Sequence, residues 1–173
     1  IDTRSKGDYI ESRNGLWLDA ITVKDANDIL NHVSDSDEIV AIDEIQFFDE
    51  NIVNVVKHLI NSKKRVIASG LDLDFKGEPF GYMPELLCLA DKVDKLAAVC
   101  MKCGSDHATR TQRLINGVPA DKSSPLIMIG GDETYEARCI DCYEIPDVKS
   151  ETRKRGFKLC LLYTSDAADD LIG

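Results

Sequence analysis

The chain has 173 residues, of which 43% are hydrophobic and 30% charged, and this length allows one compact domain or one domain with a small appendage. Its net charge of −10 argues against non-specific binding to the phosphate backbone of nucleic acid, so we expect a small-molecule substrate. No apolar run approaches the roughly 20 residues of a membrane helix, and no basic-then-apolar signal segment is present, so we expect no membrane contact.

The first half of the sequence predicts helices that alternate with apolar strands. Residues 22–33 are expected to form a short helix, because their apolar residues recur at helical spacing. Residues 38–43 (EIVAID) and 66–71 (VIASGL) have the composition of buried strands, and between them Asp49 is placed to cap an amphipathic helix. A strand, a helix and a strand over this length predict a βαβ unit, and hence an α/β fold with a parallel sheet.

A second helix and a third strand are expected before the character of the sequence changes near Ala98. Residues 82–90 have the pattern of an amphipathic helix, and residues 96–99 that of another strand of the sheet. Beyond Val99, short strand-like segments alternate with Gly, Pro and paired Cys residues. We therefore predict an α/β domain over residues 1–98, a small second domain over 99–145 and a C-terminal extension over 146–159.

The end of the chain, residues 160–173, is interpreted as an artefact. Its segment 160–170 (CLLYTSDAADD) resembles one reading frame of a common transposase sequencing adapter. The alternative is a genuine acidic tail, which detection of this peptide in the mature protein by mass spectrometry would establish. We exclude the segment from functional reasoning.

Four of the six cysteines form two CxxC pairs, Cys100 with Cys103 and Cys139 with Cys142. Each pair can grip one ion from a tight turn, and two pairs complete a tetrahedral set of four thiolates, which suits Zn²⁺. Such a filled site has no open position for a substrate, so the zinc is expected to be structural. The alternative is a redox-active or accidental set, although paired cysteines without a signal segment favour a reduced compartment and a metal.

An apolar strand that ends in two acids is the next chemical signal. In IVAIDEIQFF, residues 39–48, Asp43 ends the strand in a way that resembles a Walker B element, whose aspartate helps to hold Mg²⁺ on a nucleotide. Glu44 follows at the carboxyl end of the strand, where open α/β sheets place their sites, and a carboxylate there can accept a proton from an attacking hydroxyl. The same pattern also fits an ordinary strand terminus.

Two glycine-containing segments are candidates for a ligand pocket. The 70–81 loop (GLDLDFKGEPFG) carries Phe75 and Phe80 near the same edge of the sheet, and stacking on a base requires exposed ring faces. In the segment 125–139 (PLIMIGGDETYEARC), Gly130 and Gly131 let the backbone approach a ligand, and Tyr135 offers a hydroxyl. The alternatives are a loop packed onto the core by its Phe residues and a plain β-turn inside the cysteine-rich domain.

Taken together and in this order, these segments resemble the thymidine kinase family of the zinc-containing type. The resemblance runs from Asp2 to Tyr143 and is carried by DEIQFFD, GLDLDFKGEPFG, KLAAVCMKCG, TQR and IGGDETYEARCIDCY. It implies a P-loop-type parallel sheet flanked by helices, with a small zinc-ribbon lasso domain. It also implies ATP-dependent transfer of the γ-phosphoryl group to the 5′-hydroxyl of thymidine, with deoxyuridine as a lesser substrate and dTMP as the product.

The resemblance assigns roles to individual residues. Glu44 is implied as the base that takes the 5′-hydroxyl proton, and Asp43 as the aspartate linked to Mg²⁺. The implied cofactor-binding residues are Asp2, Thr3, Arg4, Asp43 and Gln46, of which the first three lie beside the phosphates in the family. The implied nucleoside-binding residues are Leu71, Phe75, Phe80, Thr111, Leu126, Ile127, Met128, Ile129, Gly130 and Tyr135. The implied zinc ligands are Cys100, Cys103, Cys139 and Cys142.

The sequence departs from the family at the phosphate loop. The family begins with a glycine-rich loop that ends in Gly-Lys-Ser or Gly-Lys-Thr, and the sequence contains neither motif. We therefore expect the chain, which begins at Ile1, to be an N-terminally truncated piece with poor ATP binding and no useful kinase activity. A smaller departure is Arg13, at a position where the family commonly carries His.

The resemblance further implies feedback inhibition by thymidine triphosphate (dTTP), a homotetramer and a cytoplasmic location. A rival from another class is a non-catalytic zinc-ribbon binding module on an α/β scaffold, which predicts zinc binding without nucleoside affinity. A second rival is a P-loop ATPase or a kinase for another nucleoside. The response to thymidine, compared with cytidine and adenosine, distinguishes these possibilities.

Overall fold

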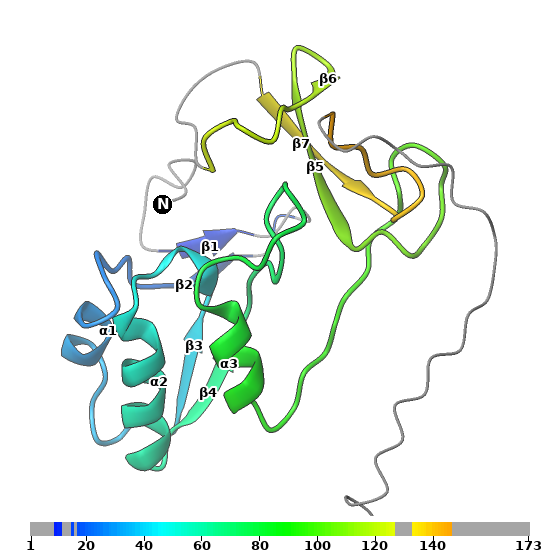
Figure 1. Cartoon of the computed structure of the whole chain (residues 1–173). Helices are drawn as coiled ribbons and strands as arrows, with labels where there is room; N and C mark the ends of the chain where they lie inside the picture. Colours follow the sequence, from blue (N-terminus) through cyan, green and yellow to red (C-terminus); the bar gives the residue numbers. More distant parts are fainter. Residues whose placement is uncertain (1–8, 12–14, 16, 127–132, 147–173) are drawn as a thin grey trace, which may run out of the picture.

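The computed structural model describes residues 9–11, 15, 17–126 and 133–146 (Figure 1). In this part of the chain, helices and a parallel pair of strands form an α/β unit. An antiparallel sheet and the paired cysteines form a second, cysteine-rich unit. Some predicted residues lie outside the described ones, namely Asp2, Thr3, Arg4, Arg13, Ile127, Met128, Ile129, Gly130, Gly131 and the segment 160–173. None of the helices in the described part is long and apolar enough to span a bilayer.

β3 (Ile39–Ile42), α2 (Asn51–Asn61) and β4 (Arg65–Ala68) form the predicted βαβ unit. The two strands are parallel and paired along their whole lengths. Glu50 directly precedes α2, one residue after the Asp49 that was predicted to cap it, and Asp49 Oδ1 accepts a hydrogen bond of 2.9 Å from the backbone N–H of Asn51. The α/β class and the parallel sheet are therefore confirmed.

The apolar stripe of α2 packs against β3 and the neighbouring helices. Ile52, Val55, Val56 and Leu59 are each at most 6% exposed and share a core with buried residues of β3 and of α3 (Met83–Leu89). α3 corresponds to the helix predicted over residues 82–90. This core fixes the carboxyl ends of β3 and β4, after which several predicted site residues follow.

The two parallel strands are less buried than predicted. Val40, Ile42 and Val66 belong to the core, whereas Ile39 is 55% and Ile67 is 48% exposed. Among the described residues this sheet has only two strands. In β3 exposed and covered residues alternate, as in a strand with one packed face, whereas in β4 only Val66 is partly buried.

The helix predicted over residues 22–33 is shorter than expected. An antiparallel pair, β1 (Tyr9–Glu11) and β2 (Trp17–Asp19), precedes a short helix, α1 (Asp28–Asn31). Asp25 Oδ1 accepts the backbone N–H of Asp28, and the Asp28 carboxylate in turn accepts the N–H of Lys24. Such local side-chain bonds compete with helical backbone bonds, and so the first half of the predicted helix forms turns instead.

The third sheet strand predicted over residues 96–99 is wrong. Ala98 makes a single antiparallel bridge, and its partner is Ala108 of the cysteine-rich unit rather than a residue of β3 or β4. Leu96 is 88% exposed, so this apolar segment lacks the covered surface that a central strand needs. The segment instead connects the two units.

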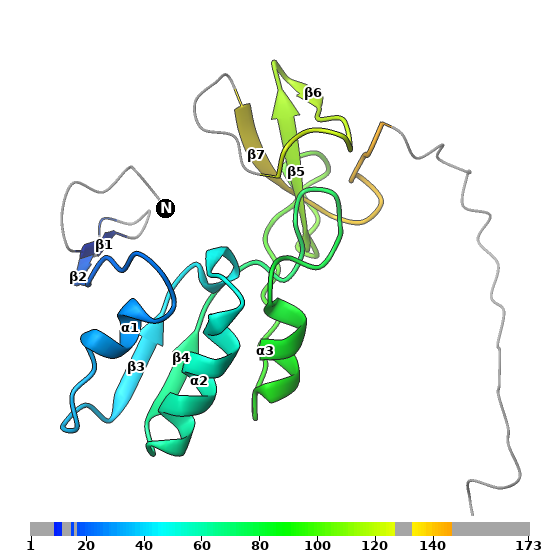
Figure 2. The ribbon, with the colours of Figure 1, turned by 60° about the vertical axis from the view of Figure 1, so that its left-hand side comes forward.

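The sheet of the cysteine-rich unit is antiparallel, with strand order β6–β5–β7. β5 (Arg110–Ile115) pairs with both β6 (Val118–Pro119) and β7 (Glu133–Arg138). Asn116 and Gly117 join β5 to β6 with φ values of 51° and 76°, the left-handed pair that two-residue hairpins favour. Figure 2 shows that this sheet and the βαβ unit occupy separate parts of the molecule.

The cysteine-rich unit contacts the α/β unit through the 70–81 loop, which follows β4. Tyr143 Oη donates a hydrogen bond to the carbonyl oxygen of Phe75. Lys122 Nζ lies 2.7 Å from Glu78 Oε1, and Arg113 Cζ lies 5.0 Å from the centroid of the Phe75 ring. Residues far apart in the sequence thus meet near the carboxyl ends of the parallel strands.

Candidate active site and metal centre

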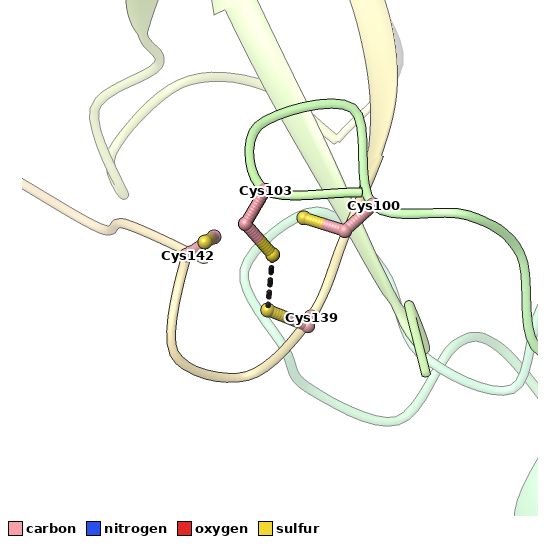
Figure 3. A group of neighbouring side chains, drawn as sticks. All are labelled: Cys100, Cys103, Cys139 and Cys142. Atoms are coloured by element: carbon pink, nitrogen blue, oxygen red, sulfur yellow. Dashed lines mark hydrogen bonds between the residues drawn. The ribbon is translucent and has the colours of Figure 1, made fainter. Parts of the chain in front are cut away.

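The four paired cysteines converge, as predicted. Their sulfur atoms all lie within 4.8 Å of one another, and Cys103 Sγ is 3.7 Å from Cys139 Sγ (Figure 3). Four sulfurs around one Zn²⁺, with Zn–S bonds of about 2.3 Å, would lie about 3.8 Å apart. The four thiols could therefore hold a zinc ion with tetrahedral geometry.

Backbone hydrogen bonds form the two turns that present these thiols. The N–H of Gly104 donates to Cys100 O at 2.9 Å, and its φ of 76° explains why glycine follows the first pair. In the second turn, the N–H groups of Cys142 and Tyr143 both donate to Cys139 O, at 3.1 and 3.0 Å. Both halves of the centre are thus shaped by the backbone as well as by the thiols.

The pKa values of two thiols in the cluster shift in opposite directions. Contact with the Cys103 thiol is the largest of the causes that raise the pKa of Cys142 to about 12. Burial acts to raise the pKa of Cys100, but the backbone N–H groups of Cys139, Cys103 and Lys102 outweigh burial and bring it to about 6. The two pKa shifts differ in direction because Cys100 accepts backbone hydrogen bonds, whereas Cys142 contacts the other thiols of the cluster. A divalent cation bound by the four thiolates would neutralise their charge.

Asp43 and Glu44 lie at the carboxyl end of β3, as predicted, and both are exposed. Asp43 Oδ1 accepts hydrogen bonds from Ser69 Oγ at 2.5 Å and from the backbone N–H of Glu44 at 2.9 Å. Ser69 follows β4, so this carboxylate joins the ends of the two parallel strands. Ser69 was not among the predicted residues, and its only signal is its position directly after the second strand.

Glu44 has an unusual backbone conformation and a buried partner. Its φ of 51° and ψ of 39° lie in the left-handed region, which is uncommon for a residue other than glycine. Gln46 is only 2% exposed; its Nε2 donates to Glu44 Oε2 at 2.5 Å, and its Oε1 accepts the backbone N–H of Leu71 at 3.2 Å. Gln46 therefore links the Glu44 carboxylate to the start of the 70–81 loop.

Two glycines leave the space that Gln46 occupies. A Cβ added to Gly70 would lie 2.3 Å from Gln46 Oε1, and one added to Gly81, whose φ is 50°, would lie 2.5 Å from Gln46 O. Both distances are too short for a carbon atom to fit without movement of its neighbour. The glycines at the two ends of the 70–81 loop are therefore explained by close approach to this glutamine.

The aromatic residues of the 70–81 loop are buried. Phe75 is 6% and Phe80 is 8% exposed, so the expectation of free ring faces in this loop is wrong for both. Phe75 packs against Arg113, and Phe80 makes an edge-to-face contact with Phe47, with ring centroids 5.3 Å apart. Exposed apolar surface at this edge comes instead from Phe47, at 46%, and Leu71, at 43%. Phe47 was not predicted, although the double phenylalanine after the acidic pair is a signal for it.

The other predicted nucleoside-binding residues that the structure describes belong to the cysteine-rich unit. Thr111 lies on β5 and is partly buried, Tyr135 lies on β7 and is 49% exposed, and Leu126 is 39% exposed. Arg113, directly opposite Tyr135 in the sheet, has its Cζ 5.0 Å from the Phe75 ring and 5.8 Å from the Tyr135 ring. Arg113 was part of the TQR motif without an assigned role, and it lies between two of the predicted residues.

A comparison with known protein families supports the resemblance found in the sequence. The family model described as thymidine kinase matches residues 1–143 of the 173-residue chain. The matched span includes the βαβ unit, the 70–81 loop and all four clustered cysteines. It ends at Tyr143, which is also the last residue of the resemblance found in the sequence. The sequence motifs and the family model therefore agree on the same region.

Proposed function

The chain belongs to the thymidine kinase family, and we propose that its site serves transfer of the γ-phosphoryl group of ATP to the 5′-hydroxyl of thymidine, giving dTMP, with deoxyuridine as a lesser substrate. Because this sequence has no Gly-Lys-Ser or Gly-Lys-Thr motif, turnover is proposed for the product of the complete reading frame and not for this chain alone. The observation that carries this proposal is the arrangement at the carboxyl end of β3. There the exposed carboxylate of Glu44 accepts a hydrogen bond from buried Gln46, which also accepts one from Leu71. A candidate base and the loop beside it are thereby held at one edge of the sheet.

Glu44 is the proposed general base. As the 5′-oxygen bonds to the γ-phosphorus and the bond to the bridging oxygen of ADP breaks, the hydroxyl proton passes to the Glu44 carboxylate. The hydrogen bond from Gln46 fixes one carboxylate oxygen and so restricts the direction from which the hydroxyl can approach. Placement of this kind is the main contribution that a protein makes to phosphoryl transfer.

Asp43 is the proposed contact to magnesium-bound ATP. Its carboxylate is exposed at the strand end, and carboxylate oxygens are ligands that Mg²⁺ prefers. When bound, Mg²⁺ would neutralise charge on the phosphates. The family resemblance adds Asp2, Thr3, Arg4 and Gln46 to the proposed nucleotide site. Because both ends of the Gln46 amide contact protein, its proposed contribution acts through the position of Glu44.

The proposed nucleoside-binding residues differ in the surface that they offer. They are Leu71, Phe75, Phe80, Thr111, Leu126, Ile127, Met128, Ile129, Gly130 and Tyr135. Leu71 offers exposed apolar surface, whereas buried Phe75 and Phe80 shape the loop from within. We add Phe47 to the proposal, because its exposed ring lies against Phe80 beside the acidic edge.

One structural Zn²⁺ is proposed for the four-cysteine centre, with Cys100, Cys103, Cys139 and Cys142 as its ligands. A tetrahedral set of four thiolates leaves no open coordination position, so the ion would take no direct part in the reaction. The proposed domains are a partial kinase domain over residues 1–98, a zinc-binding lasso domain over 99–145 and an extension over 146–159. The ion would reduce the conformational freedom of the lasso domain before a nucleoside binds.

Assembly and regulation are proposed from family membership. They comprise a homotetramer, feedback inhibition by dTTP and a role in cytoplasmic nucleoside salvage. Light scattering tests the homotetramer, and product formation in the presence of dTTP tests the feedback inhibition. If the protein is a monomer and dTTP does not inhibit it, the proposals for assembly and regulation are wrong, and only those for the catalytic site remain.

Thymidine binding tests the proposed function on the chain itself. Calorimetric titration is expected to show binding of thymidine and not of cytidine or adenosine, and thymidine should protect the segment between β6 and β7 from protease. Zinc binding without thymidine affinity would instead support a non-catalytic zinc-ribbon module. Turnover is measured separately on the product of the complete reading frame, because this sequence has no Gly-Lys-Ser or Gly-Lys-Thr motif.

A further inference from the structure

Tyr143 anchors the 70–81 loop directly beside the metal centre. Its Oη donates to the carbonyl oxygen of Phe75. A Cβ added to Gly77 would lie 3.3 Å from Tyr143 Oη, so the loop passes close to the tyrosine ring. Tyr143 directly follows Cys142, and its N–H donates to Cys139 O. The second cysteine turn and the anchor of the loop therefore share one short piece of chain.

Arg113 reaches the same loop residue from β5. It is 0% exposed, and its Cζ lies 5.0 Å from the Phe75 ring centroid and 5.8 Å from the Tyr135 ring centroid. Its Nη1 donates to Pro125 O at 2.6 Å. Burying a guanidinium is costly unless other groups compensate its charge and its donors. Contacts to three separate segments, rather than the filling of space, therefore explain an arginine at this position.

The 70–81 loop is held together by its own hydrogen bonds. Asp74 is 6% exposed, and its Oδ1 accepts the backbone N–H groups of Lys76 and Glu78 at 2.8 and 3.0 Å. The N–H of Asp74 donates to Glu78 O at 2.9 Å. Because these bonds join one half of the loop to the other, release of Phe75 is expected to affect the whole loop.

We propose that Tyr143 and Arg113 are positioning residues that hold the 70–81 loop, and that the metal centre influences the position of Glu44 through this loop. The remaining links are the hydrogen bonds from Leu71 N–H to Gln46 Oε1 and from Gln46 Nε2 to Glu44 Oε2. The role of Glu44 rests on the proposed function, whereas the contact between the metal centre and the loop does not. A bound ion thereby affects the reaction without touching the substrate.

Amide hydrogen exchange of the zinc-loaded chain tests this inference. Tyr143→Phe removes the hydroxyl and keeps the ring, and Arg113→Lys keeps the charge and removes the planar guanidinium. Each variant is expected to speed exchange of the 70–81 loop amides by about fivefold to tenfold, the effect of one lost net hydrogen bond. One zinc per chain should remain bound, exchange in α2 should stay unchanged, and thymidine affinity should fall by a similar factor.

Lys122→Met is the matched control, because Lys122 pairs with Glu78 and joins the same two units. Both side chains are about half exposed, at 46% and 53%, so amide exchange in the 70–81 loop should change by less than about twofold.

Wild-type rates of loop exchange in Tyr143→Phe and Arg113→Lys overturn the inference. Equal acceleration of exchange in α2 also overturns it, because that result marks a global loss of stability. Tyr143→Phe decides alone if Arg113→Lys does not fold. A wild-type chain that binds no thymidine refutes the proposed function, while loop exchange still decides on the two positioning residues.

Discussion

The α/β unit and the cysteine-rich unit hold their functional residues by different means. The buried cluster of the α/β unit draws side chains from α1, α2, α3 and β3, and it needs no ion to exclude water. The buried cluster of the cysteine-rich unit consists of Cys100, Ala108 and Cys139, two of which are candidate metal ligands. So small an apolar cluster supplies little hydrophobic stabilisation. Packing therefore positions Glu44 from one side, and the metal centre positions the 70–81 loop from the other.

Metal removal should give the largest difference between the two units. Chelation, or Cys139→Ala, is expected to abolish amide protection in β5 and β7, because structural zinc contributes about 10–16 kcal/mol of apparent binding free energy in small zinc domains. α2 should keep its protection, as hydrogen exchange with a parallel assay of metal content would show. Cys88→Ser, on α3 and outside the cluster, is the matched control. Protected β5 and β7 strands in the metal-free protein would contradict the comparison.

A cavity in the core of the α/β unit should destabilise that unit and leave the metal centre intact. Ile52 on α2 is 0% exposed, so Ile52→Ala is expected to lower the free energy of unfolding by about 2–5 kcal/mol while zinc stays bound. Ile60 on the same helix is 46% exposed, and Ile60→Ala should cost less than about 1 kcal/mol. Urea unfolding followed by circular dichroism measures both. Loss of zinc from the folded Ile52→Ala protein would show that the two units do not depend on separate forces.

The close approach of Gly70 to Gln46 predicts an effect of intermediate size. A Cβ at residue 70 would lie 2.3 Å from Gln46 Oε1, so Gly70→Ala is expected to cost about 1–3 kcal/mol of unfolding free energy. Gln46→Ala removes the group that clashes. The double variant should therefore lose less stability than the sum of the two single variants. Additive losses in urea unfolding would mean that the glycine is not required by the glutamine.

An exposed ion pair should have the smallest effect. Lys95 Nζ lies 2.7 Å from Asp72 Oδ2 in the 70–81 loop, and the side chains are 68% and 33% exposed. Lys95→Met is expected to change the free energy of unfolding by less than about 1 kcal/mol, since water and salt screen such pairs. Lys92→Met, which removes another exposed pair, is the control. A much larger loss of unfolding free energy for Lys95→Met than for Lys92→Met would show that the Lys95–Asp72 pair stabilises the loop.

Local sequence patterns were sufficient to predict the βαβ unit and the cysteine cluster. The apolar residues of α2 recur at helical spacing, and Asp49 accepts the backbone N–H of Asn51 at the start of the helix. The two CxxC pairs converge, as expected if their four thiols can bind a single ion. These features depend on the spacing of residues within short segments, which a sequence shows directly.

Contacts between distant segments could not be predicted in the same way. Leu71 lies 25 residues beyond Gln46, and Phe75 is covered by Arg113 from another unit. Burial of Phe75 therefore depends on a partner that no local pattern indicates. The short α1 has a local cause, the Asp side chains that compete with helical backbone bonds, and the exposed segment 96–99 lacks a surface to pack against. Hydrophobic spacing indicates neither of these.

The most direct test of this account is turnover by Glu44→Gln in the product of the complete reading frame. Because an amide cannot accept the hydroxyl proton, kcat is expected to fall by about 10²–10⁴-fold while thymidine affinity and zinc content stay near wild type. Glu50→Gln, which changes an exposed acid at the start of α2, should retain wild-type turnover. Wild-type turnover by Glu44→Gln, in a protein that binds zinc and thymidine, would contradict the account.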